Sequence, residues 1–424
     1  MMSPFTSTRI LSISLLTLLL ALTPVVHATI NGGCDESELN SGATCSAMDV
    51  PAENDIGNYF TLEKAIDSCN STGDKLDAYS SLYKQIVSKR NLRWKKLRED
   101  GGEINFIQMI NDKLGGYLYA TKMGVRTPRI LFCGIVKGLP RDIQLAFGDR
   151  YVVKLLKGYN AQGVKVVIDG VNILKDEKVT YDTLASEYEL EDAIIVEDFV
   201  ESANVKYDGL VPPDYKFHVF GGRPEIMWFV DRNRNAKCKN YYDLSSAQEW
   251  RFMEGFLDTK LPNCSPSGDE HGHYLEPSRR IALANAVQVL ADNIPGNNWV
   301  RIDMYDSKDG PILGEFTPFS SNGKTTPLDG CVMSYLFIAY SEKYGGWTDD
   351  AATASRLKDK VGDFRNELGI DRVISISAAE KTLYHQSNMG FFSPEAREWY
   401  QSDILRKCQK VMAAQYEFYH KEEE

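Results

Sequence analysis

The chain has 424 residues, with 48 Lys and Arg against 59 Asp and Glu, so its formal net charge at pH 7 is -11. Binding to a nucleic-acid backbone requires a basic surface, and this acidic balance predicts no nucleic-acid partner. Hydrophobic residues make up 43% and charged residues 25%, which is typical of a globular protein and excludes both wholesale disorder and a polytopic membrane protein.

The N-terminal segment 1–28 has the features of an export signal. Arg9 supplies a positive charge, the run from Ile10 to Val26 is almost entirely apolar, and Ala28 offers a small residue for cleavage. An uncleaved membrane anchor is the alternative, whereas cleavage leaves no stable anchor. Both interpretations predict the secretory pathway, either the ER or Golgi lumen or secretion, where cysteines pair.

Eight cysteines are present, and their spacing fixes no pairing. Cys34, Cys45 and Cys69 lie in a polar leader, residues 29–75, without CxxC or Cys/His spacing, which favours structural disulfides over a zinc site. An Asn-Ser-Thr sequence predicts an N-glycan at Asn70.

Apolar residues recur at helical spacing from Phe106 to Leu118, which predicts one helix that is closed by Gly124 and followed by an apolar strand over 129–133. Farther along, 193–200 reads as a strand that turns acidic at its end.

Two strands, 151–156 and 164–168, flank a loop that contains Gly158 and Gly163 and predict a hairpin with a long tip. Backbone N–H groups of such a loop can bind phosphate oxygens while Lys154, on the first strand, neutralises their charge. A lysine whose stem lies on the sheet and whose amine reaches water is the alternative. Neither a Walker motif nor a dinucleotide-binding fingerprint is present.

A second hairpin is expected from 215–220 and 225–230, which flank the turn dipeptide Gly221-Gly222. Lys216 lies on its first strand and is open to the same two interpretations as the lysine of the earlier hairpin. His218, two residues later, is assigned no role. An amphipathic helix then follows, with Pro277 in its first turn.

The sharpest local signal is a pair of strands within residues 299–317. If Lys308-Asp309-Gly310 forms a three-residue loop, Ser307 pairs with Pro311 and Asp303 lies directly opposite Glu315. Because side chains alternate along a strand, both carboxylates then lie on the same face of the hairpin. The same register places Arg301 and Tyr305 on that face, opposite Thr317 and Leu313 respectively.

Two carboxylates about 5 Å apart repel each other and need compensation. Mg²⁺ suits such a pair, because it prefers oxygen ligands and usually binds substrate phosphates as well. Arg301, on the same face, could bind a phosphate through two N–H groups. Two alternatives remain open: a solvent-facing hairpin whose charges are satisfied by water and Arg301, and two acids that share a proton.

The order of these elements resembles the ATP-grasp superfamily, and more closely its TupA-like, teichuronopeptide-biosynthesis branch, from about Asn111 to Gly323. The segments that carry the resemblance are Asn111-Asp112-Lys113, Tyr151-Val152-Val153-Lys154, Ile195-Val196-Glu197-Asp198-Phe199-Val200, Asp214-Tyr215-Lys216-Phe217-His218 and the Arg301-x-Asp303 strand with Glu315. The resemblance implies an α+β fold of ATP-grasp architecture, with a small N-terminal α/β domain, two nucleotide-clamping α+β lobes and a helical C-terminal extension.

The resemblance also implies roles for individual residues, which no spacing argument supplies. The main chain at Glu197, Asp198 and Phe199 would bind adenine, and a nearby acid, for which Glu201 is the candidate, would hold the ribose. The remaining implied roles are phosphate contacts from Lys154 and the loop glycines Gly158 and Gly163, catalytic roles for Lys216 and Arg301, and metal ligation by Asp303 and Glu315. Most ATP-grasp enzymes have an asparagine where this chain has Thr317, which puts a third protein ligand in doubt.

With ATP and Mg²⁺ as cofactors, the predicted function is an ATP-dependent ligase of the secretory pathway that activates a carboxylate as an acyl phosphate for attack by an amine, on a small-molecule or glycan substrate. A sugar or polysaccharide kinase and a non-catalytic secreted glycoprotein are the alternatives. The predicted organisation is a signal peptide (1–28), the polar leader (29–75), an N-terminal region (76–148), a small nucleotide-binding lobe (149–200), a large lobe with the metal site (201–330) and a helical extension (331–424).

Overall fold

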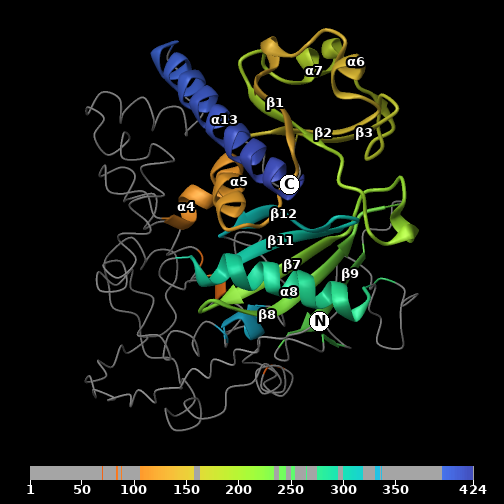
Figure 1. Ribbon diagram of the computed structural model, residues 1–424, viewed down its shortest axis with the longest axis vertical. Helices are drawn as coiled ribbons and strands as arrows, with labels where there is room; N and C mark the ends of the chain where they lie inside the picture. The colour runs from red at the N-terminus through yellow and green to blue at the C-terminus, as the bar shows by residue number, and fades with distance from the viewer. Residues whose placement is uncertain are drawn as a thin grey trace, which may run out of the picture.

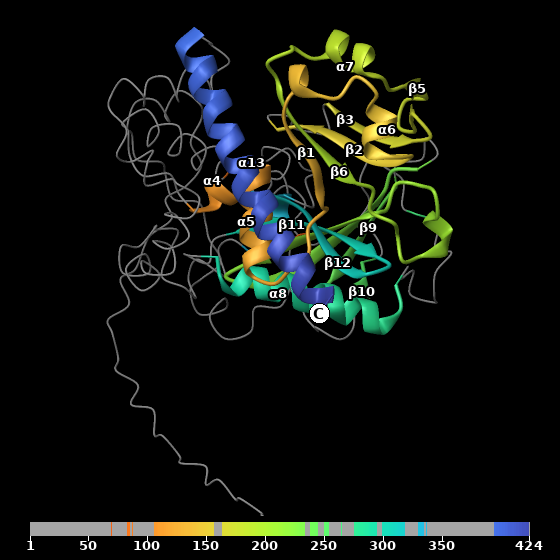
Figure 2. The same cartoon turned by 45° about the horizontal axis from the view of Figure 1, so that its top comes forward.

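The computed structural model describes residues 106–156, 163–233, 238–244, 250–253, 275–294, 299–318, 330–334 and 394–423, together with Cys69, Tyr83, Lys84, Val87, Cys264 and Leu336. Within this part of the chain, two antiparallel sheets of six strands each form two lobes (Figures 1 and 2). Helices and antiparallel sheets together give the α+β class that the sequence predicts.

The small lobe has the strand order β1-β6-β2-β3-β4-β5. Its strands are β1 (Ile130–Ile135), β2 (Arg150–Leu155), β3 (Val164–Ile168), β4 (Val171–Asn172), β5 (Glu177–Lys178) and β6 (Ala193–Asp198). The expected hairpin of β2 and β3 is confirmed, with Lys154 opposite Val164. The acidic strand is confirmed as β6, and it lies between β1 and β2.

One face of this sheet packs under two short helices, α6 (Ile143–Phe147) and α7 (Tyr181–Glu187) (Figure 2). Val153 and Val196 belong to that apolar cluster. Side chains alternate along a strand, so Lys154 on β2 and Glu197 on β6 lie on the opposite face.

The large lobe has the strand order β10-β9-β8-β7-β11-β12. Its strands are β7 (Asp214–Phe220), β8 (Arg223–Asp231), β9 (Cys238–Asp243), β10 (Arg251–Phe252), β11 (Val300–Ser307) and β12 (Gly310–Thr317). The hairpin of β7 and β8 turns at Gly221-Gly222, where both residues have positive φ, 55° and 79°. This conformation suits a tight hairpin turn and carries no penalty for glycine.

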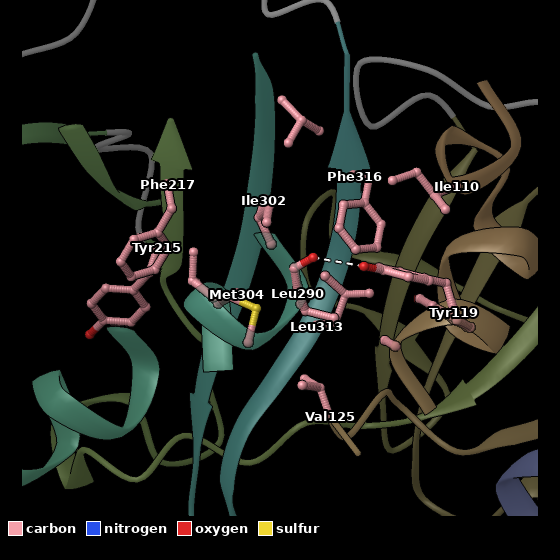
Figure 3. Close-up of a cluster of buried hydrophobic side chains, with 14 of the residues drawn as sticks. Ile110, Tyr119, Val125, Tyr215, Phe217, Leu290, Ile302, Met304, Leu313 and Phe316 are labelled. Carbon is pink, nitrogen blue, oxygen red and sulfur yellow. Dashed lines mark hydrogen bonds between the residues drawn. The ribbon is translucent and has the colours of Figure 1, made fainter. Parts of the chain in front are cut away.

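Helix α8 (Pro277–Asp292) covers one face of the large sheet, as its apolar spacing predicts (Figure 1). Leu290 belongs to a buried cluster that includes Phe217, Met304 and Leu313 (Figure 3). The phenol of Tyr119 donates to the Leu290 carbonyl over 2.7 Å. This hydrogen bond joins the helix that carries Tyr119, residues Lys113–Lys122, to α8. Because side chains alternate along each strand and the apolar ones pack into this cluster, the charged side chains of the sheet lie on the opposite face.

The prediction of one helix from Phe106 to Leu118 is wrong, because the chain forms two helices, α4 (Phe106–Asn111) and α5 (Lys113–Lys122). Asp112 interrupts them. Its backbone is extended, and its carboxylate accepts hydrogen bonds from the N–H groups of Leu114 and Gly115, so it caps α5 instead of continuing the first helix.

The C-terminal helix α13 (Pro394–Glu423) packs against α5 and β1 (Figure 1). The Gln415 side chain accepts from the N–H of Ile130 and donates to Thr127 and to the Pro128 carbonyl. The disulfide Cys133–Cys408 joins the same helix to β1. The helix begins at Pro394.

Two further disulfides, Cys69–Cys331 and Cys238–Cys264, are present among the described residues. The expected structural role of Cys69 is therefore confirmed, while Cys34, Cys45 and the glycosylation site at Asn70 lie outside the described residues. In the part of the chain described, no helix combines the length and apolarity needed to cross a membrane. The apolar segment 10–26 is not in that part.

Candidate active site

The charged face of the large sheet carries the acids and cations singled out from the sequence. Lys216 on β7 lies opposite Asp303 on β11. Asp303 in turn lies opposite Glu315 on β12. Arg301, two residues before Asp303, shares its face. Three adjacent strands therefore bring these side chains together, and only sheet topology places β7 beside β11.

The predicted three-residue turn between β11 and β12 is wrong, although the pairing derived from it is right. Ser307 pairs with Gly310, which leaves a two-residue turn and shifts the register by one. The register shifts back between Asp303 and Met304, so that Gly314 is an extra residue on β12 and Asp303 again faces Glu315. The shift also corrects the prediction that Leu313 faces Tyr305, since Leu313 pairs with Met304 and is buried in the core.

Glycine is required at this bulge for a steric reason. A Cβ atom at Gly314 would lie 2.9 Å from the Tyr305 ring and 3.2 Å from the carbonyl oxygen of Asp303. The first distance is shorter than real Cβ contacts, so a larger residue would push the two strands apart. Gly314 therefore permits the close approach that sets the two carboxylates opposite each other.

Arg301 and Lys216 neutralise Asp303, which is 2% exposed. Arg301 donates to both carboxylate oxygens, over 2.6 Å from Nε and 2.7 Å from Nη2, and the Lys216 ammonium makes an ion pair with one of them. Burial by itself would raise the pKa of Asp303, but the two cations outweigh burial and hold that pKa well below its usual range. Asp303 is therefore ionised at neutral pH.

Glu315 is the accessible member of the pair, with 45% of its side chain exposed. Its carboxylate accepts from Arg301 over 3.1 Å, and Arg301 also donates to the Thr317 hydroxyl over 2.9 Å. Arg301 thus spans both acids. The sequence left open that this arginine satisfies the hairpin's charges, and the structure shows that it does so here.

Asp214 and Arg232 extend the network, and neither was named as a site residue from the sequence. Asp214 is bound by Lys216 over 3.2 Å and by Arg232 over 2.8 Å. Burial opposes ionisation of Asp214, but these two cations keep its pKa below the usual value. Asp214 lies two residues before Lys216 on the same strand, so the two side chains share one face. This spacing could have identified Asp214 from the sequence.

The small lobe contributes Lys154, whose ammonium is 2.6 Å from a carboxylate oxygen of Glu197. Both side chains are buried. The phenol of Tyr117, on α5, donates to Glu197 over 2.8 Å, accepts from Lys154 over 3.2 Å and lies 3.4 Å from the Gly314 carbonyl. Burial first, and then Glu197, raise the pKa of Tyr117, so the phenol keeps its proton. This tyrosine connects the small lobe to β12 of the large lobe.

Lys113, the first residue of α5, is a further cation near these acids, and the sequence pattern by itself assigned it no role. Glu315, Lys154 and Glu197 all act on it electrostatically, which places it between the two lobes. Burial lowers the pKa of Lys113 more than these acids raise it. Lys113 directly follows Asp112, which caps α5, and this position could have identified it from the sequence.

The hinge between the lobes is held by charges. Glu201 binds Arg150 over 3.1 Å and Lys308 over 2.5 Å, and Lys308 lowers the pKa of Glu201. Asp198 binds Arg129 over 2.7 Å. Both acids sit where the chain passes from β6 to the large lobe. Their carboxylates already have cationic partners in this structure.

The remaining predicted residues fall at the same junction or outside it. Phe199 follows the end of β6. The N–H of Asp198 donates to the Arg129 carbonyl, so adenine-binding main-chain groups would begin at Phe199. Gly163 directly precedes β3, has a φ of 68°, and its carbonyl accepts from the N–H of Leu155. Gly158 lies outside the described residues.

The residues present fit a hard divalent cation. Asp303 and Glu315 offer facing carboxylate oxygens, which Mg²⁺ prefers, and Mg²⁺ commonly uses one or two carboxylates together with phosphate oxygens and water. No group of three or more His, Cys, Asp and Glu that could hold a metal occurs among the described residues. A cation here would complete its coordination with oxygens from a bound substrate or from water.

Comparison with protein-family models gives a match to the TupA-like ATP-grasp model over residues 91–330, more than half of the chain. The chain belongs to the TupA-like ATP-grasp family. This finding confirms the resemblance and the ATP-grasp architecture inferred from the sequence. It also supports, at the coarse level, an ATP-dependent ligase of the ATP-grasp type.

Solved structures with a similar fold are distant from this TupA-like chain. A D-alanine–D-alanine ligase from Bacillus anthracis complexed with ATP has 12% identity and a TM-score of 0.32, covering 58% of this chain and 73% of its own. An N5-carboxyaminoimidazole synthetase from Staphylococcus aureus complexed with ADP has 11% identity and a TM-score of 0.31, covering 61% and 62%. No curated protein matches the chain.

Proposed function

We propose that this TupA-like protein is an ATP- and Mg²⁺-dependent ligase of the secretory pathway that joins a carboxylate to an amine. The observation that carries the proposal is the convergence of Lys154 from one lobe with Lys216, Arg301 and the two facing acids from the other. Tyr117 connects the halves through hydrogen-bond-range contacts to Glu197, Lys154 and the Gly314 carbonyl.

Burial of three cations costs desolvation free energy, and this cost is offset only if each cation has an anionic partner. In this structure the partners of Lys154, Lys216 and Arg301 are carboxylates. Phosphate oxygens of ATP would supply stronger partners. We infer that Lys216 and Arg301 contact the phosphates when nucleotide binds, which frees oxygens of Asp303.

The proposed reaction has two steps. A carboxylate oxygen of the first substrate attacks the γ-phosphorus, the bond to the β-phosphate oxygen breaks, and ADP leaves. The amine nitrogen of the second substrate then attacks the acyl carbon, releases inorganic phosphate and loses a proton to form the amide. Lys154, Lys216 and Arg301 stabilise the charge that develops on the phosphoryl oxygens.

Asp303 and Glu315 would hold Mg²⁺, which supplies Lewis-acid stabilisation of the phosphates when bound. No protein side chain need act as a nucleophile in this scheme. We propose a small-molecule or glycan substrate, by analogy with the teichuronopeptide branch of the family.

The proposed location in the ER or Golgi lumen, or outside the cell, draws support from the disulfides. The described residues contain three of them, one joining strands to a helix 275 residues later in the sequence. Such bonds form and persist in oxidising compartments. Cleavage of segment 1–28 and glycosylation at Asn70 remain predictions that mass spectrometry of the secreted chain tests.

Calorimetric titration of the disulfide-intact protein with ATP, with and without Mg²⁺, tests the function. Glu315→Gln is the decisive variant, because Glu315 is half-exposed and its loss leaves the buried pair of Arg301 and Asp303 intact. We expect Mg²⁺-dependent binding in the wild type and its loss in the variant. Glu417→Gln, on the exposed face of α13, removes the same charge far from the site and serves as the control.

Two results would reject the proposal: no Mg²⁺-dependent ATP binding by the wild type, or full binding by Glu315→Gln. Product analysis then separates the reactions, since a ligase forms an amide from two substrates while a kinase forms a phosphoester on one. Asp303→Asn is a poor first choice because it leaves two buried cations without their shared anion, at a cost of about 3–5 kcal/mol.

A further inference from the structure

A buried histidine on the site face has ring nitrogens without a partner in the part of the chain that the structure describes. His218 is 0% exposed, and neither Nδ1 nor Nε2 makes a hydrogen bond to a described residue. Its ring centroid is 4.0 Å from that of Trp228 and 5.8 Å from that of Trp299. The tryptophan rings pack against the imidazole but give its nitrogens no hydrogen bond. Since buried polar atoms are nearly always hydrogen-bonded, this exception calls for a physical reason.

The position of His218 relative to the hinge suggests that reason. Ser202, in the hinge, bridges to Ser307 at the end of β11. Asp303 lies farther back along β11, and Arg301, which pairs with His218, is farther still. Two residues along a strand add about 7 Å. The pair of Arg301 and His218 is therefore on the side of the metal-site acids away from the hinge.

The electrostatic surroundings of His218 are cationic. Among the described residues, Arg301, Lys239 and Lys216 act on the ring, and each of these cations lowers the pKa of His218. A neutral imidazole still has one N–H donor. A buried donor close to three cations is suited to an oxyanion.

We propose that His218 and Arg301 together bind the carboxylate of the substrate that is activated by ATP, with an imidazole N–H donating a hydrogen bond to one carboxylate oxygen. This inference rests on the proposed ligase function and identifies where its first substrate binds. The adenine would lie at the hinge and the phosphates at Lys216 and Arg301, so the carboxylate enters from the far end, next to the γ-phosphate. Access to the ring follows the movement of Arg301 from Asp303 to the nucleotide.

The test uses acetate as the probe, the smallest carboxylate, added to the disulfide-intact protein saturated with ADP and Mg²⁺. Labelling of the histidines with carbon-13 at the ring Cε1 gives one signal for each histidine, and the signal lost in His218→Phe identifies His218. We expect that signal to shift saturably with acetate and to ignore chloride at equal ionic strength. His420, exposed on α13, should not respond.

The Phe variant keeps an aromatic ring between the two tryptophans but removes both nitrogens. We expect its affinity for ADP and Mg²⁺ to stay within about twofold of wild type while its affinity for acetate, measured by calorimetry, falls about tenfold or more. A residue that only packs the core would change neither affinity selectively. If the Phe variant does not fold, His218→Gln assigns the signal and the wild-type titration decides.

Three outcomes overturn the inference. The His218 signal fails to respond to acetate although ADP and Mg²⁺ bind; it responds to inorganic phosphate and not to acetate, which assigns the position to the γ-phosphoryl group; or His218→Phe binds acetate as wild type does. If the wild type binds no nucleotide, the proposed ligase function is wrong, and the proposed carboxylate site is then wrong as well.

Discussion

Replacement of His218 by phenylalanine should make the folded state less sensitive to mild acid. Burial, and then Arg301, Lys239 and Lys216, lower the pKa of His218 well below its ordinary value of 6.5. The folded protein therefore keeps the imidazole neutral where the unfolded chain takes up a proton. A base whose pKa is lowered by folding destabilises the folded state as the pH falls through the unfolded pKa, and it costs little above that pKa.

The size of the effect follows from the unfolded pKa. With an unfolded pKa of 6.5 and a folded pKa below the range tested, proton uptake by the unfolded chain favours unfolding by about 0.2 kcal/mol at pH 7 and about 1.4 kcal/mol at pH 5.5. The wild type should thus lose about 1.3 kcal/mol more than His218→Phe over this interval. At pH 7 the variant should be as stable as the wild type or more so, because two unpartnered buried nitrogens are removed.

Urea unfolding at both pH values, with the disulfides intact, measures this difference. His420→Phe is the control, since His420 is exposed on α13. Equal losses of stability in the wild type and His218→Phe would show that His218 titrates normally in the folded protein. The account of a buried, neutral imidazole would then be wrong.

Three other substitutions test separate parts of the site and fold. Gly314→Ala should abolish Mg²⁺-dependent ATP binding in calorimetry, because its Cβ would collide with the Tyr305 ring and separate the metal-site strands; unchanged binding would show that the bulge is dispensable. Tyr117→Phe should weaken ATP binding about tenfold through loss of its hydrogen bonds to the Lys154–Glu197 ion pair, with the far-ultraviolet spectrum unchanged, and an unaltered affinity would contradict the positioning role. Cys133→Ser breaks the bond between β1 and α13, across 275 residues, and should lower the free energy of unfolding by about 2–4 kcal/mol; an unchanged thermal midpoint would show that Gln415 and its neighbours suffice.

The sequence alone fixed the local elements that carry the site. Alternation and turn residues were enough to predict the hairpins that hold Lys154 and Lys216, because both are determined within a few residues. The pairing of Asp303 with Glu315 was also within reach, although through the wrong turn. The cysteines pointed to disulfides without identifying their partners, since pairing depends on distances across the fold.

Tertiary structure decided which of these elements meet. No local pattern sets β7 beside β11 or β6 beside β2, because strand order depends on how two whole sheets close over their cores. Tyr117 joins residues from three separate segments, and the ring nitrogens of His218 could be recognised as unpartnered only once its described neighbours were placed. Charge and periodicity are written along the chain, whereas burial and the balance of charges in a site are properties of the packed molecule, and these set the pKa of Asp303 and of His218.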